Sequence, residues 1–355
     1  HRDLHSFPTR RSSDLLFFII MFTDKKILIT GGTGSLGNAL SKRLLDLGAD
    51  TIRIFSRNES KQIGMESEIN SDKIRYLIGD VRDSPRLEKA LEGIDIVFHA
   101  AALKHVPVIE YNPFEAIKTN VLGTQNVIDA CLKENVETVI GISTDKAVSP
   151  LNTYGATKLL MEKLLTTTHN YLDKKRYRTK FLALRYGNVL GSSGSVLPKF
   201  IKQIKAGEKV TITDPNMTRF SMTMDEALDF ILESASIGRG SEVFIPKLEA
   251  YSVNDLKNAL FELLGNTGEK IISLRPGEKM HEAFINFDEI RYAWEYKNKY
   301  VLFNSSKKEE EIKKEYPTIK RIDISEEYSS DMVGKISSEK LKDIIVKSGF
   351  LENKQ

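Results

Sequence analysis

The sequence predicts an α/β fold, in which a doubly wound parallel sheet is followed by a smaller C-terminal lobe. Short apolar runs alternate with segments of helical periodicity through the first half of the chain, and no hairpin signal joins consecutive runs. From Gly187 onward glycine and serine become frequent, which indicates entry into a second unit. With 355 residues the chain is long enough for both parts.

The first strand and the first helix enclose a glycine-rich turn. The apolar run 25–30 is followed by this turn and then by helical periodicity over 38–47, which Gly48 ends. Glycines here let the backbone approach a pyrophosphate, which binds the N–H groups at the helix start. This order of elements predicts a Rossmann-type dinucleotide site formed by Gly31, Thr33, Gly34, Ser35, Leu36 and Gly37.

The end of the second strand bears on the choice of cofactor. The run Thr51–Phe55 is followed by Arg57, with Lys61 nearby, where an NAD-selective site usually carries Asp or Glu. A guanidinium suits a 2′-phosphate, so these residues predict NADP. The alternative for Arg57, a solvated surface arginine, stays open. Two more predicted cofactor contacts follow the third strand: Asp80, expected to accept from the adenine amino group, and Val81.

The fourth predicted strand, 94–98, runs into a segment of small residues. Small side chains let the cofactor lie against the end of the strand. The predicted cofactor contacts here are Ala100, Ala101 and Ala102. Lys104 comes next and is predicted to contact the substrate, because a cation is otherwise poorly placed after apolar residues. His99 is interpreted as a buried structural residue.

The range Pro113–Glu134 predicts one long helix, with proline at its start and an apolar stripe along it. Asn120 is interpreted as a helix-surface residue and Cys131, the one cysteine of the chain, as part of the core. In the homo-oligomer that the family resemblance described below implies, this helix is a candidate contact between subunits. A single cysteine allows no internal disulfide, which is consistent with a reducing cytoplasm.

The segment after the central strand carries an acid, a base and a hydroxyl group. Thr144, Asp145 and Lys146 are expected at the carboxyl end of that strand, where open α/β sheets bind ligands. Tyr154 and Lys158 share one helix face, where the ammonium would lower the pKa of the phenol and make it a general base. The alternative for Asp145 and Lys146 is a surface ion pair, with Thr144 as a cap.

The N-terminal segment and the net charge of the chain bear on its location and on its binding partners. Residues 1–20 are predicted to be a non-native leader, since SFPTRRSSDL looks like a translated sequencing adapter, and Met21 is taken as the start. The segment 1–15 holds three Arg and two Asp, so without it the net charge of +3 becomes +2. Near-neutral charge favours neither nucleic acid nor an anionic membrane. The apolar run 15–20 is shorter than the roughly 20 residues of a membrane span, so we expect a cytoplasmic protein.

The predicted domain boundaries follow these patterns. The range 21–186 is expected to be the NADP-binding Rossmann domain with the catalytic loop. The range 187–304 is expected to be mainly the substrate-binding lobe, some segments of which return to the sheet. The remainder, 305–355, combines a charged stretch with a terminal helix that packs on the sheet or on another subunit. Helices in the second half are predicted over 225–236, 253–264 and 338–346.

A series of motifs runs from Gly31 to Lys279 in the order GGTGSLG, GDVRD, HAAALKHVP, STDKA, YGATK, RYGNVLGS and RPGEK. On these motifs the chain resembles the extended short-chain dehydrogenase/reductase superfamily, and most closely the inverting UDP-N-acetylglucosamine 4,6-dehydratases of bacterial surface-sugar biosynthesis. Retaining sugar-nucleotide dehydratases typically carry Thr-Asp-Glu at the strand end, whereas this chain has Thr144-Asp145-Lys146, as the inverting kind does.

The resemblance implies a complete reaction. Tyr154 takes the 4-hydroxyl proton while NADP⁺ accepts the C4 hydride, Lys158 holds the phenolate and the nicotinamide ribose, and Thr144 binds the 4-oxygen. Lys146, if burial or Lys158 lowers its pKa, is the base at C5, and Asp145, if protonated, donates to the departing 6-hydroxyl. The hydride returns to C6, C5 is inverted, and NADP is retained. The implied product is UDP-2-acetamido-2,6-dideoxy-L-arabino-hexos-4-ulose.

The resemblance also implies the contacts of the UDP-sugar in the second half of the chain. These substrate contacts are Asn188, Val196, Arg219, Arg275 and Glu278, while Val189 is implied as a cofactor contact. The alternative for either arginine is an ordinary surface residue. No metal-ligand spacing is seen among the histidines.

Two other functions stay open. A UDP-N-acetylhexosamine 4-epimerase needs only Tyr154 and Lys158, and it has no use for Asp145 and Lys146. A catalytically silent NADP-sensing protein of the same fold would not need the tyrosine and lysine, yet both are present.

Overall fold

One large sheet runs through the structure, a computed structural model that describes residues 20–190 and 195–351. Its parallel strands are β1 (Lys26–Thr30), β2 (Thr51–Ser56), β3 (Ile74–Ile78), β4 (Ile96–His99), β5 (Thr138–Ile142), β6 (Lys180–Leu184) and β10 (Val243–Pro246). Antiparallel strands extend it: β14 (Ala293–Tyr296), β15 (Lys299–Leu302) and β16 (Lys320–Arg321). The order is β16-β14-β15-β10-β6-β5-β4-β1-β2-β3, which confirms the predicted doubly wound parallel sheet.

One hairpin lies near the edge of this sheet, in a part of the second half of the chain where the sequence predicted no strands. Strands β14 and β15 pair antiparallel, with Tyr296 opposite Lys299. The turn between them holds Lys297 at a φ of 54°. A positive φ in a two-residue turn usually calls for glycine, asparagine or aspartate, so the lysine hid the turn from sequence inspection.

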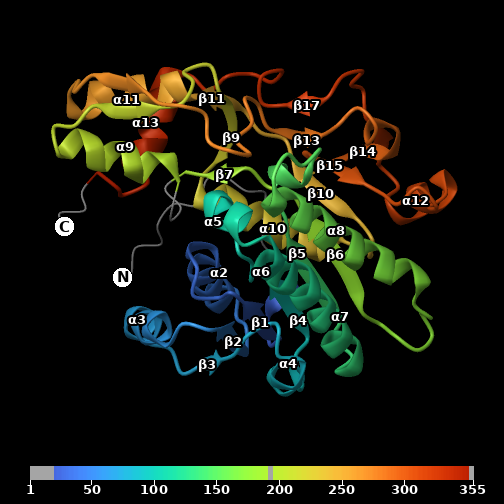
Figure 1. The fold of residues 1–355 in the computed structure, drawn as a ribbon. Helices are drawn as coiled ribbons and strands as arrows, with labels where there is room; N and C mark the ends of the chain where they lie inside the picture. Colours follow the sequence, from blue (N-terminus) through green and yellow to red (C-terminus); the bar gives the residue numbers. More distant parts are fainter. Residues whose placement is uncertain (1–19, 191–194, 352–355) are drawn as a thin grey trace, which may run out of the picture.

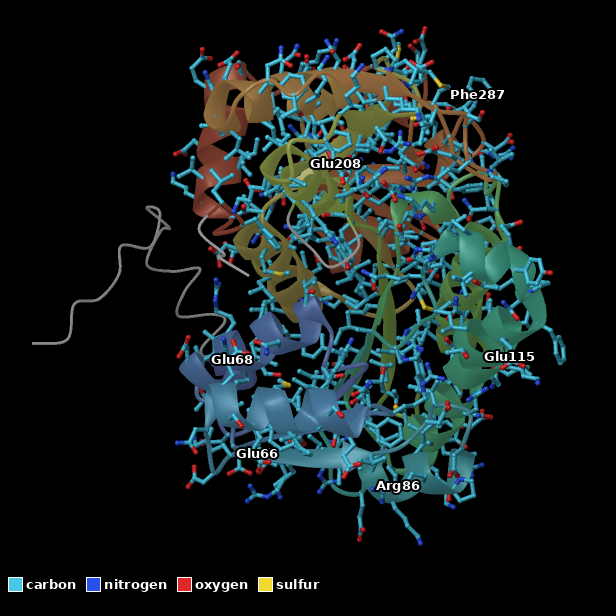
Figure 2. The ribbon with its side chains drawn as sticks, turned by 60° about the vertical axis from the view of Figure 1, so that its left-hand side comes forward. Glu66, Glu68, Arg86, Glu115, Glu208 and Phe287 are labelled. Carbon is cyan, nitrogen blue, oxygen red and sulfur yellow. The ribbon has the colours of Figure 1, made fainter. Side chains whose placement is uncertain are left out.

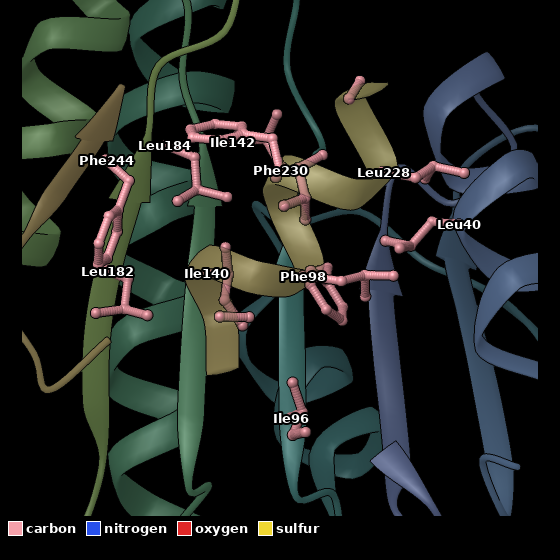
Figure 3. Close-up of a cluster of buried hydrophobic side chains, with 14 of the residues drawn as sticks. Leu40, Ile96, Phe98, Ile140, Ile142, Leu182, Leu184, Leu228, Phe230 and Phe244 are labelled. Carbon is pink, nitrogen blue, oxygen red and sulfur yellow. The ribbon is translucent and has the colours of Figure 1, made fainter. Parts of the chain in front are cut away.

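Helices cover both faces of the sheet. One face carries α2 (Ser35–Asp46), α3 (Glu59–Ile69) and α10 (Met224–Ile237), and the other carries α4 (Ser84–Leu91), α7 (Gly123–Lys133) and α8 (Thr153–Tyr171). Successive strand residues alternate between the two faces: Ile27 packs with the first group and Leu28 with the second. Figure 3 shows the first core, in which Leu228 of α10 lies next to Leu40 of α2. Cys131 is fully buried in the second core, as predicted.

The predicted long helix is continuous but not uniform. It consists of α6 (Pro113–Ala116), a π-helical turn η1 (Ile117–Leu122) and α7, and α5 (Val106–Tyr111) precedes it. Asn120 lies in η1 and is 1% exposed, so its interpretation as a helix-surface residue is wrong. A π-helical turn changes which side chains face inward, and an α-helical stripe cannot reveal that.

The smaller lobe is built from three passes of the chain away from the sheet. After β6 come β7 (Asn188–Val189), α9 (Val196–Lys205), β8 (Val210–Ile212) and β9 (Thr218–Met222). After β10 come β11 (Ala250–Ser252), α11 (Val253–Leu264), β12 (Glu269–Ile271) and β13 (Ala283–Ile285). After β16 come β17 (Tyr328–Ser329) and α13 (Ser338–Lys347). The remaining elements are η2 (Asp145–Ala147), η3 (Ile290–Tyr292) and α12 (Glu309–Glu315).

The terminal helix α13 belongs to this lobe rather than to the sheet. Leu341 and Ile345 are fully buried in a core shared with α9 and α11. Figure 1 shows α9, α11 and α13 grouped at one end of the molecule, away from α3 and α4. Two packing sites were predicted for this helix, the sheet and another subunit. The prediction that it packs on the sheet is therefore wrong.

The outside of the molecule is polar and mixed in charge. Figure 2 shows Glu66 and Glu68 on α3 and Glu208 of the lobe directed toward solvent. Within the described ranges, no helix combines the length and the apolar character needed to cross a membrane. The predicted leader, 1–20, lies outside the described residues except for Ile20, and so do residues 191–194 of the glycine and serine loop.

Candidate active site

The segment after β5 forms the floor of the candidate site. Strand β5 is buried along its whole length, and Ser143, Thr144 and Asp145 remain buried beyond its end. Thr144 caps the short helix η2, because its hydroxyl accepts from the backbone N–H of Lys146 at 3.4 Å. The same hydroxyl donates to Asp145 Oδ1 at 2.8 Å. The cap predicted as an alternative role is therefore present, and it also orients the carboxylate.

Lys146 lies between two carboxylates. Its Nζ is 2.9 Å from Asp145 Oδ1 and 3.2 Å from Oε1 of Glu282, which precedes β13. Asp145 is 1% exposed and Glu282 2%, so this is a buried ion triad and not the surface ion pair of the alternative reading. Burial would lower the pKa of Lys146, but the two carboxylates outweigh it and raise the pKa. The condition stated for Lys146 as a base, a pKa lowered by burial or by Lys158, is therefore not met in this arrangement, because Asp145 and then Glu282 oppose burial.

Tyr154 adjoins this triad from the first turn of α8. Burial raises the pKa of Tyr154 to about 12, while the charge of Lys146 and a hydrogen bond with Thr144 lower it, and Asp145 raises it. The buried phenol of Tyr186 lies near both Tyr154 and Asp145, whose charges raise its pKa further after burial. The structure therefore brings Thr144, Asp145, Lys146 and Tyr154 together.

Lys158 lies on α8 one turn after Tyr154. Its Nζ donates to the backbone carbonyl of Ile142 at 2.7 Å, so it faces the end of β5. Burial lowers the pKa of Lys158 to about 8, although the charge of Glu162 raises it. The cation that lowers the pKa of the Tyr154 phenol here is Lys146. Helical spacing fixes a common face but not which acceptor a flexible lysine selects.

Asn120 ties the loop after β4 to the helix of Tyr154. Its side-chain oxygen accepts from the Leu103 N–H at 2.8 Å, and its amide donates to the Leu103 carbonyl at 2.9 Å and to Thr157 Oγ1 at 3.0 Å. All of its hydrogen-bonding capacity except one acceptor position is thereby used inside the protein. The loop that carries Lys104 and the helix that carries Tyr154 are therefore fixed to each other.

The glycine turn has the geometry of a dinucleotide cradle. Gly31 has a φ of 67°, and a Cβ there would lie 2.8 Å from Ala101 Cα. A Cβ on Gly37 would lie 2.4 Å from the Gly32 carbonyl oxygen, so helix and turn pack backbone to backbone. Gly34 is the N-cap of α2 and has no side chain to accept from the N–H groups of the first turn. These groups fit an anion such as a pyrophosphate, and Thr33, Ser35 and Leu36 lie beside them in the same turn.

His99 links β4 to its neighbours. One ring nitrogen lies 2.8 Å from Thr30 Oγ1 and the other 2.9 Å from Thr124 Oγ1. Burial, with the charge of Lys158, lowers the pKa of His99 from 6.5 to about 3. The imidazole is thus a neutral, fully buried structural group, as predicted. Thr30 in turn accepts from the Ala101 N–H at 3.2 Å, which holds the alanine segment 100–102 beside Gly31.

The ends of β2 and β3 hold the residues expected at the adenosine. Arg57 is half exposed and lies 3.7 Å from Asp80 Oδ2. Asp80 is more tightly engaged by Arg82, whose guanidinium lies 2.6 Å from Oδ2. Partial burial raises the pKa of Asp80, but the hydrogen bonds and charge of Arg82 and the charge of Arg57 lower it overall. The carboxylate predicted to bind adenine therefore already has a partner, while Val81 is buried beneath it.

Two lysines complete this basic edge. Partial burial and the positive charge of Lys61 lower the pKa of Lys104, which shows that the two side chains lie near each other. Lys61 stands at the start of α3, where its N–H donates to the Asn58 side chain. The loop residue predicted to bind substrate is therefore close to a residue predicted to bind cofactor.

The predicted substrate residues fall into two groups. Arg219 of β9 donates to the carbonyls of Thr218, Lys279 and Met280, and its charge acts on Lys146. Asn188 hydrogen bonds with the buried Tyr251 of β11, and Val189 is buried next to it. The structure brings this first group to the triad.

The second group lies around the RPGEK turn. The Arg275 N–H donates to Glu278 Oε2 at 3.3 Å, and Gly277 approaches Asn152, the N-cap of α8, with its carbonyl accepting at 2.8 Å. Partial burial and the charge of Arg275 lower the pKa of Lys199 on α9, against the charge of Glu278. Lys199 is thus a cation at this site that the sequence did not single out. Val196 begins the same helix.

A buried arginine connects the two parts of the molecule behind the site. Arg185 follows β6 and pairs with Glu162 of α8 at 2.8 Å and with Glu289 at 2.7 Å. Glu162 also accepts from Ser143, the residue before Thr144. Neither Glu162 nor Glu282 was found from the sequence. Their signal was weak: each is a carboxylate inside an otherwise apolar stretch near a motif.

Over residues 20–190 and 195–351, no group of three or more His, Cys, Asp or Glu side chains is arranged to hold a metal ion.

Comparisons with known proteins agree with this geometry. A family model described as polysaccharide biosynthesis protein matches residues 27–304. An inverting UDP-N-acetylglucosamine 4,6-dehydratase of Campylobacter jejuni is 45% identical over 325 residues, which are 91% of this chain and 92% of that protein. A crystal structure of Pen from Bacillus thuringiensis is 41% identical with a TM-score of 0.86, over 93% of this chain and 99% of that one. A UDP-glucose 4-epimerase of Rickettsia rickettsii is 39% identical over 341 residues, 94% of this chain and 98% of that protein.

Proposed function

The chain belongs to the polysaccharide biosynthesis protein family of extended short-chain dehydrogenases/reductases, and from this premise we propose that it dehydrates UDP-N-acetylglucosamine at C4 and C6 with inversion at C5. One observation carries the proposal. An acid and a base, Asp145 and Lys146, lie in one buried cluster with Tyr154. Oxidation at C4 needs the tyrosine alone, whereas loss of water across C5 and C6 needs an acid and a base as well.

The first step belongs to Tyr154 and Thr144. Tyr154 takes the proton of the 4-hydroxyl, and Thr144, which hydrogen bonds with the phenol, steadies the 4-oxygen. Burial disfavours the phenolate and raises the pKa of Tyr154 to about 12, and the charge of Lys146 opposes this effect. A bound nicotinamide dinucleotide supplies the hydride acceptor at C4 and the hydride donor at C6. Lys158 holds the end of β5 and the ribose beside it.

The second step belongs to Asp145 and Lys146. Transfer of one proton from Lys146 Nζ to Asp145 Oδ1, across 2.9 Å, turns the ion pair into an amine and a carboxylic acid. The amine takes the C5 proton, made acidic by the 4-ketone, and the acid protonates the 6-hydroxyl so that water leaves. The pair ends as ammonium and carboxylate, as it began. A hydride returned to C6 and a solvent proton added to C5 from the opposite face would then give the L-arabino product.

The UDP part of the substrate is assigned to the lobe side of the site. Arg219, Arg275 and Lys199 supply positive charge for the diphosphate, since guanidinium and ammonium groups bind phosphate oxygens well. Glu278 suits the ribose hydroxyls. The other contacts assigned to the nucleotide sugar are Lys104, Asn188 and Val196.

NADP is the proposed dinucleotide. The glycine turn, with Gly31 and Gly37, accommodates the pyrophosphate, and Arg57 and Lys61 stand at the end of β2, where a 2′-phosphate would lie. Asp80 would have to exchange its contact with Arg82 for the adenine amino group.

A homo-oligomer is proposed for the assembly. Large apolar side chains are exposed on α5, α6, η1 and α8, and a second copy of the chain would cover them: Val108, Tyr111, Phe114, Leu122 and Leu160. A cytoplasmic location agrees with the single buried cysteine.

Proton NMR of the purified protein with UDP-N-acetylglucosamine in D₂O, without added cofactor, tests the proposal. We expect a new C6 methyl signal, deuterium at C5 and L-arabino couplings. Conversion to the 4-epimer without a methyl signal would favour the second candidate, a sugar-nucleotide 4-epimerase, which the relative of that name supports. Absence of any turnover, even after NADP is added, would contradict both functions for this substrate and would leave another sugar nucleotide or a catalytically silent NADP-sensing protein.

A further inference from the structure

Glu282 reaches the candidate site from the smaller lobe. Its side chain is 3% exposed and its Oε1 lies 3.2 Å from Lys146 Nζ, whereas Lys146 belongs to the segment after β5. The backbone of Glu282 is fixed by Ser330: the Glu282 N–H donates to Ser330 Oγ at 3.0 Å, and the Ser330 N–H donates to the Glu282 carbonyl at 2.8 Å. Ser330 in turn bonds to Thr218 of β9. The backbone that carries this carboxylate is therefore anchored to β9 of the lobe.

The hydrogen-bonding capacity of the Glu282 carboxylate is only partly used within the described residues. Glu282 Oε2 is buried and has no hydrogen-bond partner among the described residues, and the same is true of Asp145 Oδ2. A buried carboxylate oxygen without a hydrogen-bond partner costs free energy of folding, and a buried ion pair is by itself weak evidence for a stabilising role. Stability alone therefore gives no reason for Glu282 to be at this position.

The charges around Lys146 come from several elements. Asp145 and Glu282 are negative, Arg219 of β9 is positive, and Lys279 also lies close enough for its charge to interact with Asp145, Lys146 and Glu282. Tyr154 faces the same cluster. Without Glu282, the positive charges of Arg219 and Lys279 would repel the Lys146 ammonium, and Asp145 would be its one remaining carboxylate partner in this cluster. The amine would then have no fixed place beside its acid partner.

We propose that Glu282 is a positioning residue that acts through Lys146, holding the amine beside Asp145 and keeping it protonated until the sugar enters. The inference deepens the proposed function and rests on it. Glu282 makes no contact with the reacting carbons in this scheme. Its effect is confined to where Lys146 Nζ lies and when it gives up its proton.

Glu282→Gln tests the proposal, because it keeps the shape and removes the charge. We expect oxidation at C4, measured by the absorbance of reduced nicotinamide, to persist. Deuterium exchange at C5 should fall about 100-fold, as it does when a catalytic group is misplaced. The ascending limb of the pH profile of exchange should move to lower pH by about one to three units, because the ammonium loses an opposite charge. Thermal stability should not fall. Glu282→Asp should restore part of the pH profile.

Two controls separate positioning from a general structural role. Glu269→Gln removes a half-exposed carboxylate paired with Lys257 in the lobe, and it should leave exchange and pH profile unchanged. In a Lys146→Ala background, Glu282→Gln should cause no further loss of exchange. Wild-type exchange in Glu282→Gln, an unmoved pH limb, or an additive loss in the double variant would each overturn the proposal.

A measurement without turnover distinguishes this inference from the proposed function. Acetylation of Lys146 by acetic anhydride at increasing pH, followed by peptide mass spectrometry, reports its protonation directly. Glu282→Gln should shift the acetylation curve to lower pH even if UDP-N-acetylglucosamine is not the substrate. An unchanged curve would overturn the positioning role, whereas a shifted curve together with no dehydration by the wild-type protein would reject only the proposed function.

Discussion

Adjacent in the sequence, Asp145 and Lys146 meet through their side chains inside the protein, with Lys146 Nζ 2.9 Å from Asp145 Oδ1. Neighbouring residues on a strand would point to opposite faces, but the helical turn η2 brings these two together. The acid and the base of the proposed dehydration are thereby one unit that shares a proton.

Asp145→Asn removes the acid of this unit and keeps its shape. We expect dehydration to fall by about 10²- to 10⁴-fold, the usual contribution of a general acid. Oxidation at C4 should continue, so reduced nicotinamide should accumulate under single-turnover conditions. Asp343→Asn, which removes an exposed carboxylate on α13, is the matched control. A wild-type rate of methyl formation in Asp145→Asn would remove Asp145 from the mechanism.

Lys146→Ala removes the base. The variant should keep NADP bound, because the glycine turn is untouched, yet it should lose C5 proton exchange, measured by NMR in D₂O. Lys347→Ala, at an exposed lysine of α13, should exchange like the wild type. Retained exchange in Lys146→Ala would show that another group takes the C5 proton.

Arg57→Asp addresses cofactor choice. A lost hydrogen bond to a charged group costs about 1.5–3 kcal/mol, so NADP affinity should fall about 10- to 100-fold while NAD binding persists. Isothermal titration of the apoprotein with both dinucleotides measures this, with Arg176→Ala as a control at an exposed arginine away from β2. Equal NADP affinity would favour the alternative of a solvated surface arginine.

Gly37→Ala tests the packing of α2 on the glycine turn. The new methyl group would lie 2.4 Å from the Gly32 carbonyl oxygen, so we expect a loss of about 1–3 kcal/mol in unfolding free energy, and weaker NADP binding. Gly64→Ala on α3 is the matched control, because nothing lies within 4 Å of the added Cβ. That variant should gain about 0.5–1 kcal/mol. Equal stability of the two variants in urea would contradict the packing argument.

His99 predicts a stability that depends on pH. Its pKa falls from 6.5 to about 3 on folding, so between these values the unfolded chain binds more protons than the folded one. Its contribution to stability is therefore complete above pH 6.5 and is lost as the pH falls toward 3, at up to roughly 1.4 kcal/mol per pH unit. Urea unfolding of His99→Gln should show a flatter dependence over this range. An identical slope in both proteins would mean that other groups cause it.

The periodic parts of the fold were open to prediction because their signals are local. The strands β1 to β6 and the helices α10 and α11 follow apolar runs and apolar stripes, and each lies within a few residues of its predicted range. The hairpin of β14 and β15 was missed, since Lys297 occupies a turn position with a positive φ. Asn120 was misplaced because a π-helical turn breaks the periodicity that the prediction used.

The candidate-site residues that lie within one sequence motif could be predicted. Residues that the tertiary fold brings to the site from distant parts of the chain could not. Thr144, Asp145, Lys146 and Tyr154 come from one short stretch, and they do meet. Glu282 arrives from far along the chain, and its charge adds to that of Asp145 in raising the pKa of Lys146 against the effect of burial. The contact of Lys158 could not be predicted either, because helix spacing does not show that its ammonium donates to the backbone carbonyl of Ile142.

The three passes that build the smaller lobe have a consequence for how such a protein can change and be divided. No single cut in the chain separates the lobe from the sheet, because β10 and the strands from β14 to β16 interrupt it. Attempts to express the lobe alone, or to exchange it as a block between relatives, should therefore give insoluble fragments. A new sugar preference is more readily acquired by lengthening or shortening one pass, since the register of the sheet strands at its two ends is then preserved.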